Sequence, residues 1–337
     1  MNKDRRLEQI DMLKGIAIIS ITFLHLEAGV IPNWLNEWFG QFMISAFYFV
    51  SGWLFVNVKT IGDVWEFAKK RFRSLGIPYM WFTLLILSFD LVWCSFGFIE
   101  WRTLYVHVFN AFSLRGIGTL WFLPCLYFAE LFFLFLLRKK NPLLIGGSII
   151  FTCLYLYLYH DWKLQYRETG DLFRVIDAPF SIVARILSAW PIILSGYVLN
   201  KVCGSLLLSR PKWELSVAGL VFVLGSLCCF MFEIDLGGVF AWISNPVIIS
   251  ASLLIIFSGY NLPVISRLLK FWGKNSLVLM ATHYSIFQVI VLTVCERVFD
   301  INHFYGWTTV LAFVVVMLVE YPTVLLFRSK LSFMMGK

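Results

Sequence analysis

The chain has 337 residues, of which 60% are hydrophobic and only 14% are charged, and this composition is too apolar for a soluble globular protein. Its formal net charge of +8 would suit a protein that binds nucleic acid, but the Lys and Arg residues form short clusters between apolar runs. That arrangement is typical of the loops of a polytopic membrane protein and argues against a nucleic-acid partner.

The apolar runs predict an all-α fold of about ten membrane-spanning helices, organised as a single domain over residues 1–337. Each run is long enough to cross roughly 30 Å of hydrocarbon. The first run lacks a small-residue cleavage site, so we expect it to stay as a span and not to be removed as a signal peptide. The longest outer loop is expected at 160–179. The predicted spans are 10–28, 38–58, 76–99, 119–137, 143–159, 180–200, 214–232, 238–258, 275–295 and 306–327.

The distribution of basic residues predicts the orientation of these spans. With the amino terminus inside, the cytoplasmic loops and termini hold 20 of the 28 Lys and Arg residues, the opposite side holds six, and two lie within spans. Basic residues gather on the cytoplasmic side of membrane proteins. Both termini are therefore predicted to be cytoplasmic.

The first span, DMLKGIAIISITFLH, carries three ionisable side chains, Asp11, Lys14 and His25. At about 100° per residue they fall near one face of a helix, with Lys14 and His25 roughly 16 Å apart along its axis. Because such groups are expensive in lipid, a functional site is the default interpretation, with a structural polar contact or a snorkelling lysine as the alternative. His25 is the candidate catalytic base, since an imidazole exchanges a proton near neutral pH.

A second cluster of cations, KKRFR at 69–73, comes immediately before the third span. Several cations that converge near one side of the membrane suit a phosphate-bearing ligand. The basic run could instead be a topology signal or contact anionic lipid. Lys14 of the first span could instead only pair with Asp11. The candidate phosphate-binding residues are Lys14, Lys70, Arg71 and Arg73.

Three further ionisable side chains lie inside apolar runs. Glu130 and Arg185, in different spans, are expected to face inward and to form either a structural ion pair or part of a substrate site. His283 is expected near mid-depth in the ninth span, as a polar contact or a helper to His25. The other three histidines show no metal-binding spacing and the seven cysteines no C-x-x-C, so no metal is predicted.

Segments along most of the chain resemble the acyltransferase-3 family of integral-membrane O-acyltransferases. RRLEQIDMLKGIAIISITFLH is similar to the family's first helix, where ten residues separate a basic residue from a histidine, here Lys14 and His25. AFYFVSGWLF resembles a second-helix segment. KKRFRSLGIPY resembles the R-x-x-R and proline entry to the third helix, with Lys70 and Arg73 at the basic positions.

Two later segments resemble motifs of the branch that acetylates sugars of bacterial surface glycans, including fucose 4-O-acetylase-like proteins. They are LWFLPCLYFAE, which contains Trp121 and Glu130, and GKNSLVLMATH, which ends at His283. The chain departs from the family pattern at Lys14, where arginine is commoner; lysine keeps the charge but loses two-pronged phosphate binding. No additional carboxy-terminal domain is expected, so the membrane unit would complete the reaction alone.

The resemblance implies a multi-pass O-acetyltransferase of the bacterial inner membrane. It would move an acetyl group from cytoplasmic acetyl-CoA, its acyl donor, to a sugar hydroxyl of a surface glycan or its lipid-linked precursor. The donor's phosphates would lie near the four candidate cations. His25 would act as general base on the acceptor hydroxyl, which attacks directly or by way of a transiently acetylated group. Residues that would bind substrate or support the site are Asp11, Glu130, Arg185, His283 and Trp121.

Other functions remain open at this point. Ten spans with buried charges also suit a transporter or a flippase of glycan or lipid precursors, although broken helices at matching positions of two halves are not evident. An acyltransferase that acts on lipid or peptide would keep the donor chemistry and change the acceptor. The expected partners are membrane lipid and a glycan acceptor, and a homo-oligomer is compatible with the sequence.

Overall fold

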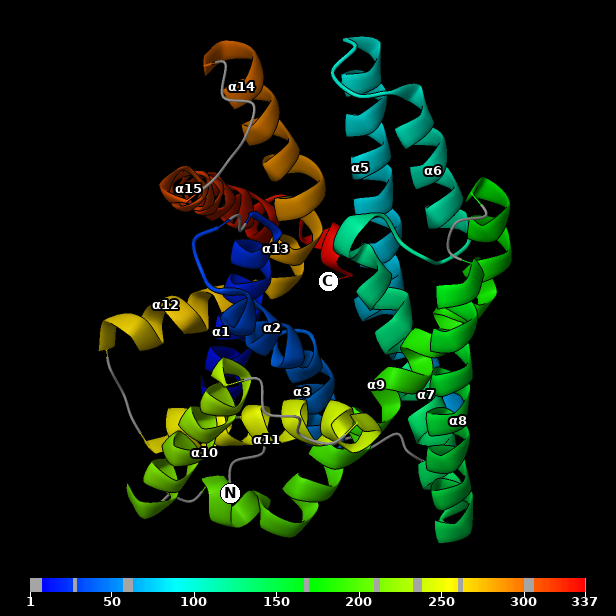
Figure 1. The fold of residues 1–337 in the computed structure, drawn as a ribbon, viewed down its shortest axis with the longest axis vertical. Helices are drawn as coiled ribbons and strands as arrows, with labels where there is room; N and C mark the ends of the chain where they lie inside the picture. The colour runs from blue at the N-terminus through cyan, green and yellow to red at the C-terminus, as the bar shows by residue number, and fades with distance from the viewer. Residues whose placement is uncertain are drawn as a thin grey trace. The chain divides into compact units, whose positions relative to one another are not determined.

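The structure is a computed structural model, and every element in the part of the chain that it describes is a helix (Figure 1). This confirms the all-α prediction. The described residues are 8–26, 29–56, 63–166, 170–208, 213–232, 238–259, 263–299 and 306–336. The elements are α1 (Glu8–Leu26), α2 (Asn33–Phe42), α3 (Ser45–Phe55), α4 (Val64–Arg71), η1 (Phe72–Gly76), α5 (Ile77–Ser95), α6 (Trp101–Phe112), η2 (Gly118–Trp121), α7 (Phe122–Lys139), α8 (Pro142–Tyr166), α9 (Gly170–Leu208), α10 (Trp213–Met231), α11 (Gly238–Gly259), α12 (Pro263–Lys274), α13 (Ser276–Thr282), η3 (His283–Gln288), α14 (Val289–Phe299), α15 (Trp307–Ser329) and η4 (Ser332–Met335).

Seven helical segments within the described ranges are long and apolar enough to cross a membrane. Two shorter apolar helices, Ser216–Met231 and Ser244–Ser258, accompany them. The total of ten spans and the cytoplasmic termini stay predictions. The seven segments are Glu8–Leu26, Val64–Ser95, Gly118–Lys139, Pro142–Tyr166, Gly170–Val202, Ser276–Arg297 and Trp307–Ser329.

The apolar run predicted as the second span, 38–58, is divided between two helices. α2 ends at Phe42 and α3 begins at Ser45, and their 10 and 11 residues are each too few to cross the hydrocarbon alone. The intervening residues, Met43 and Ile44, are apolar, so hydropathy gave no sign of the turn. Residues 57 and 58 lie outside the described part.

The basic run KKRFR was expected in a loop, but it lies on a helix. The Asp63 carboxylate accepts hydrogen bonds from the backbone N–H groups of Trp65 (2.9 Å) and Glu66 (3.1 Å), which caps α4. α4 then continues through η1, a π-helix, into α5 without a break. The cations of this run therefore have fixed positions on one continuous helix.

The longest predicted loop, 160–179, is also mostly helical. α8 extends to Tyr166 and α9 begins at Gly170. Aromatic rings at Tyr155, Tyr159, Trp162 and Tyr166 contact one another at spacings of three or four residues, with centroids 6.1–6.2 Å apart. Side chains at this spacing stabilise a helix, which explains why α8 extends beyond the end of its apolar run.

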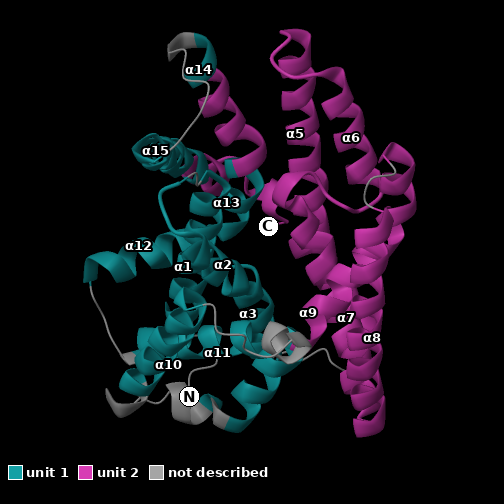
Figure 2. Ribbon diagram, viewed as in Figure 1, with its two compact units in different colours: residues 1–57, 192–283, 295–324 teal, residues 58–191, 284–294, 325–337 magenta. Residues whose placement is uncertain are grey.

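The contacts divide the chain into two compact units (Figure 2). Unit 1 comprises residues 1–57, 192–283 and 295–324, and unit 2 comprises 58–191, 284–294 and 325–337. His25 and His283 belong to unit 1. The basic run of α4 and the residues Glu130 and Arg185 belong to unit 2.

In unit 1, α1 packs along α12 so closely that their backbones touch. A Cβ atom at Gly15 would collide with the carbonyl group of Leu269, and one at Gly273 would collide with that of Asp11. α12, which lies in a predicted loop, buries Leu269 and Trp272 against α1 and leaves Val264 exposed. Small residues permit this approach, as in other membrane helix pairs.

In unit 2, α7 is the central helix and contacts α4, η1, η2 and α8. The first half of α9 is joined to α8 by a buried hydrogen bond, in which the Trp190 indole donates to the Thr152 hydroxyl over 2.9 Å. α6 packs beside α5. Like α12, this helix was not predicted. These contacts hold the polar side chains described below in fixed positions.

Substitution of Gly15 by Ala should destabilise unit 1, because the added methyl group has no room against the Leu269 backbone. We expect a loss of about 1–3 kcal/mol in the free energy of unfolding. Thermal unfolding of the full chain in detergent measures it. Gly40→Ala in α2 is the matched control, since a Cβ there meets no described atom within 4 Å. Equal stability of the two variants would contradict the close packing of α1 on α12.

Candidate active site

Asp11 and Lys14 lie one turn apart near the start of α1 and interact. The Lys14 Nζ atom is 3.4 Å from Oδ1 of Asp11, whose side chain is buried, while the Lys14 side chain is 22% exposed. The predicted shared face and pairing are thus present. The ion pair lowers the cost of a carboxylate in an apolar surrounding.

His25 lies at the other end of α1 and contacts His283 of the segment that follows α13. Its Nδ1 atom is 2.9 Å from Nε2 of His283, and the two rings are stacked with centroids 5.2 Å apart and planes 25° apart. His283 is fully enclosed, whereas His25 is half-buried. The structure therefore brings together two histidines that are 258 residues apart in the sequence.

The hydrogen bonds of His283 determine which nitrogen of His25 can accept a proton. Nδ1 of His283 lies against the carbonyl oxygen of Leu279, and a carbonyl can only accept, so this nitrogen carries a hydrogen. In a neutral ring, Nε2 of His283 is then an acceptor. His25 must donate to it from Nδ1, which leaves the lone pair of His25 on Nε2. This assignment of tautomers follows from the partners of each ring.

The backbone around His283 departs from an ordinary α-helix. α13 ends at Thr282, and His283–Gln288 form the π-helix η3. The Thr282 hydroxyl lies 2.6 Å from Oε1 of Glu320, a fully buried carboxyl group on α15. π-helical turns are frequent at functional sites, and this one places His283 opposite α1.

Arg71 and Glu130 form a two-pronged ion pair in unit 2. The guanidinium donates from Nε to Oε2 and from Nη2 to Oε1 of the carboxylate, whose side chain is almost fully buried. Arg71 was predicted to bind phosphate, and Glu130 was expected to form either an ion pair with Arg185 or part of a substrate site. The pairing of Glu130 with Arg71 was not predicted, and it arises because α4 and α7 are adjacent.

The other two residues of the basic run that were predicted to bind phosphate, Lys70 and Arg73, have exposed side chains. Lys70 lies in the last turn of α4, and Arg73 lies in the π-helix η1. An exposed lysine and an exposed arginine can reach a phosphate group, whereas Arg71 already holds a carboxylate with two of its donors. Lys70 and Arg73 are therefore the better candidates for a phosphate in this run.

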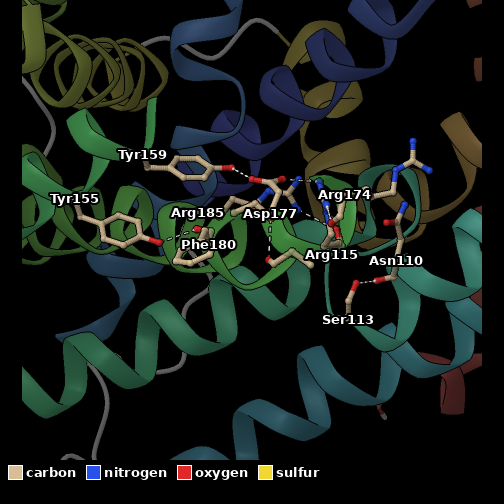
Figure 3. A network of polar contacts seen from close by, with 11 residues as sticks. Asn110, Ser113, Arg115, Tyr155, Tyr159, Arg174, Asp177, Phe180 and Arg185 are labelled. Atoms are coloured by element: carbon tan, nitrogen blue, oxygen red, sulfur yellow. Dashed lines mark hydrogen bonds and ion pairs between the residues drawn. The ribbon is translucent and has the colours of Figure 1, made fainter. Parts of the chain in front are cut away.

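Arg185 contacts Arg115 in unit 2 (Figure 3). Its guanidinium lies over the Trp121 ring, 4.6 Å from the ring centroid, and donates from Nη1 to the backbone carbonyl of Arg115 over 2.9 Å. The Arg115 guanidinium in turn is 3.1 Å from Oδ2 of the buried Asp177. Arg185 and Trp121, both predicted as substrate or supporting residues, thus lie together.

Comparison with protein families gives one match over nearly the whole chain. The Acyl_transf_3 model, which describes an acyltransferase domain, matches residues 7–326. The chain belongs to the acyltransferase-3 family. It is a membrane acyltransferase with several membrane-spanning helices. Comparisons with curated proteins and with solved structures found no match.

The acyltransferase has further buried polar groups that sequence reasoning missed. His107 of α6 holds the buried Asp90 of α5, with 2.7 Å between Nδ1 and Oδ2. Glu320 and Asp177 are also buried. Asp90 and Glu320 lie within apolar runs. An ionisable residue in an apolar run is expected to face inward, which is how Glu130 was identified, so the same reasoning could have found these two. Asp177 had no such signal, because it lies in the segment that was predicted as a loop.

Within the described part of the acyltransferase, no three His, Cys, Asp or Glu side chains come close enough together to hold a metal ion. In unit 1, the imidazole of His25 and its partner His283 suit acyl transfer by acid–base catalysis. Cations that could bind phosphate occur in each unit, Lys14 on α1 in unit 1 and Lys70 and Arg73 on α4 and η1 in unit 2.

Loss of the Glu130 charge should destabilise unit 2 of the acyltransferase. Glu130→Gln leaves the Arg71 charge without its carboxylate, and we expect a loss of about 2–3 kcal/mol. This is less than the roughly 3–5 kcal/mol of a fully buried pair, because the Arg71 side chain is 28% exposed. Denaturant or thermal unfolding in detergent measures it.

The control for this prediction is the Arg102–Asp171 pair, in which both side chains are 69% exposed. Asp171→Asn should cost no more than about 1 kcal/mol, as is usual for surface pairs. Equal effects of the two substitutions would mean that the Arg71–Glu130 pair adds no more stability than a surface ion pair.

Proposed function

We propose that this acyltransferase moves an acetyl group from cytoplasmic acetyl-CoA to a sugar hydroxyl of a surface glycan or its lipid-linked precursor, in a bacterial inner membrane. The observation that carries the proposal is the hydrogen bond between His25 and His283, in a chain whose family is one of acyltransferases. It gives one imidazole a defined proton-accepting nitrogen. The sugar acceptor rests on the resemblance of LWFLPCLYFAE and GKNSLVLMATH to segments of sugar O-acetylases.

His25 supplies the general base in this proposal. Its Nε2 atom accepts the proton of the acceptor hydroxyl while the hydroxyl oxygen forms a bond to the thioester carbonyl carbon. The carbon–sulfur bond then breaks, and the CoA thiolate leaves and takes the proton from His25. A transiently acetylated group on the protein would divide the same bond changes between two steps. In either route His283 keeps the His25 proton on Nδ1.

The donor's phosphates require cations. Lys14 of α1 is one candidate, and its partner Asp11 holds the ammonium group in place. Lys70 and Arg73 are the candidates from the basic run, because Arg71 is engaged by Glu130. On the continuous helix α1, Lys14 and His25 are eleven residues apart, a rise of about 16 Å. That length is comparable with an extended pantetheine arm, so one helix can serve both ends of the donor.

Removal of the His25 imidazole should abolish acetylation. In cells that express His25→Ala, NMR analysis of the surface polysaccharides should show loss of the O-acetyl groups present with the wild-type protein. In membrane vesicles supplied with labelled acetyl-CoA, turnover should fall about 10²- to 10⁴-fold, the usual contribution of a general base. His283→Phe should lower turnover about tenfold or more with little change in KM, since it removes the acceptor that orients His25.

The control for this prediction is His107→Phe, which removes a histidine of unit 2 that is bonded to Asp90. Membrane levels of each variant are measured alongside activity. Retained acetylation in His25→Ala would eliminate His25 as the base. An O-acetyl pattern that is the same with and without the gene would count against a glycan acceptor. Movement of a glycan or lipid precursor without acetyl-CoA would favour a transporter.

Substitution of Lys14 and substitution of His25 should change different kinetic parameters. Lys14→Ala removes a charge assigned to the donor's phosphates, so the apparent KM for acetyl-CoA should rise about tenfold while kcat changes little. Lys14→Arg keeps the charge and should retain most of the affinity. Labelled acetyl-CoA titrated into membrane vesicles measures both parameters. A loss of kcat alone in Lys14→Ala would mean that the donor is held elsewhere, most simply by Lys70 and Arg73.

A further inference from the structure

The buried Glu320 of α15 has no part in the proton transfer proposed above. Its side chain is fully enclosed, and α15 carries no other Asp, Glu, Lys, Arg or His between Trp307 and Phe327. Its Oε1 atom lies 2.6 Å from the hydroxyl of Thr282, which ends α13 in the same unit. Its other oxygen, Oε2, has no hydrogen-bond partner among the described residues.

Glu320 differs from the other buried carboxyl groups in having no cation beside it. Each of the others in the described part of the chain lies beside a Lys, Arg or His side chain, and they are Asp11, Asp90, Glu130 and Asp177. No ion pair of the described residues involves Glu320. An ionised carboxylate without a cation is very costly in an apolar surrounding, and such a group keeps its proton instead.

The Thr282 hydroxyl gives independent evidence for a proton on Glu320. Its oxygen lies 2.8 Å from the backbone carbonyl oxygen of Val278 as well as 2.6 Å from the Glu320 carboxyl group. A hydroxyl has one hydrogen, and a carbonyl can only accept. Both contacts are hydrogen bonds when the Glu320 acid donates to Thr282 and Thr282 donates to Val278. An ionised Glu320 would take the Thr282 hydrogen and leave the hydroxyl and carbonyl oxygens facing each other at 2.8 Å.

These bonds lie in the helical turn that leads to the histidine pair. Thr282 is the last residue of α13, and His283 is the first residue of the π-helix η3. The Val278 carbonyl of this turn accepts the Thr282 hydroxyl. The next carbonyl, that of Leu279, accepts Nδ1 of His283. The bond from Glu320 therefore ties to α15 the same turn that orients the His283 ring.

We propose that Glu320 is a protonated carboxylic acid and a positioning residue for His283. It donates a hydrogen bond to Thr282, and it thereby holds the end of α13 where His283 can accept the hydrogen of His25. The proton on Glu320 is inferred from the contacts alone. The positioning of the catalytic base rests on the proposed function.

The neutral state of Glu320 also protects the tautomers of the histidine pair. A negative charge at Thr282 would favour a doubly protonated ring at His283, the next residue in the chain. Both nitrogens of such a ring donate, so His25 would have to accept on Nδ1 and carry its hydrogen on Nε2. Nε2 of His25 could then take no proton from the acceptor hydroxyl. A protonated Glu320 avoids this reversal.

Infrared spectroscopy of the full chain in neutral detergent tests the proton on Glu320. A protonated carboxyl group has a carbonyl stretching band that a carboxylate lacks, and labelling with carbon-13 glutamate separates this band from those of aspartate. At neutral pH we expect such a glutamate band. It should be lost in Glu320→Gln and kept in Glu37→Gln, which replaces an exposed glutamate of α2. Thr282→Val should keep the band but shift it, because the acid loses its acceptor.

The positioning role predicts a loss of turnover that a neutral donor restores. Glu320→Met has a similar length but no donor, so kcat for acyl transfer should fall about tenfold with little change in KM. Glu320→Gln keeps a neutral donor, and Thr282→Ser keeps the hydroxyl, so both should retain most of kcat. Thr309→Val is the control, because the buried Thr309 hydroxyl on the same helix has no hydrogen-bond partner among the described residues.

Nitrogen-15 NMR of the labelled histidines reports on the positioning of His283 without any acyl transfer. Glu320→Met should change the His283 signals, because the end of α13 is released from α15. Glu320→Gln and Thr309→Val should leave these signals close to those of the wild-type protein.

Four results would overturn the proposal. They are the absence of a protonated glutamate band in the wild-type protein, a band that persists in Glu320→Gln, an unshifted band in Thr282→Val if Glu320→Gln does not fold, and a loss of kcat in Glu320→Gln as large as in Glu320→Met. Failure of acyl transfer in the wild-type protein is a separate outcome. If the infrared band and the histidine signals then respond as expected, the proposed function is refuted, and the protonated Glu320 and its hold on His283 stand.

Discussion

The hydrogen bond between the two imidazoles of His25 and His283 is the interaction on which the proposed chemistry depends. Such a bond needs one donor and one acceptor, and the Leu279 carbonyl decides which ring is which. A backbone oxygen in α13 thereby determines the proton-accepting atom of a side chain on α1. The packing of α1 on α12, through Gly15 and Gly273, holds the other end of the same helix.

Three buried carboxylates follow one pattern. Asp11 is paired with Lys14, Glu130 with Arg71, and Asp177 with Arg115, so each of these carboxylates has a cation beside it. Pairing of this kind is what an apolar surrounding demands, and by itself it indicates stability more than function. The functional candidate is the imidazole of His25, which the hydrogen bond to His283 orients.

Much of the site could be predicted from the sequence because an ionisable residue in an apolar run is visible without a structure. Asp11, Lys14 and His25 share one helix, so periodicity alone placed them on one face. The partner of Glu130 could not be predicted, since it depends on which helices are neighbours, and Arg71 reaches it only because the basic run is helical. The turn at 43–44 and the helical extension beyond His160 were also hidden, because hydropathy reports burial in lipid and not backbone hydrogen bonding.

The most direct test of the central claim is to measure which nitrogen of His25 carries the proton. Nitrogen-15 NMR of the histidine-labelled full chain in lipid distinguishes the two tautomers, and single substitutions of the five histidines assign the signals. The account predicts hydrogen on Nδ1 of both His25 and His283, and a change in the His25 signals when His283 is replaced by Phe. Hydrogen on Nε2 of neutral His25 in the wild-type protein would contradict it.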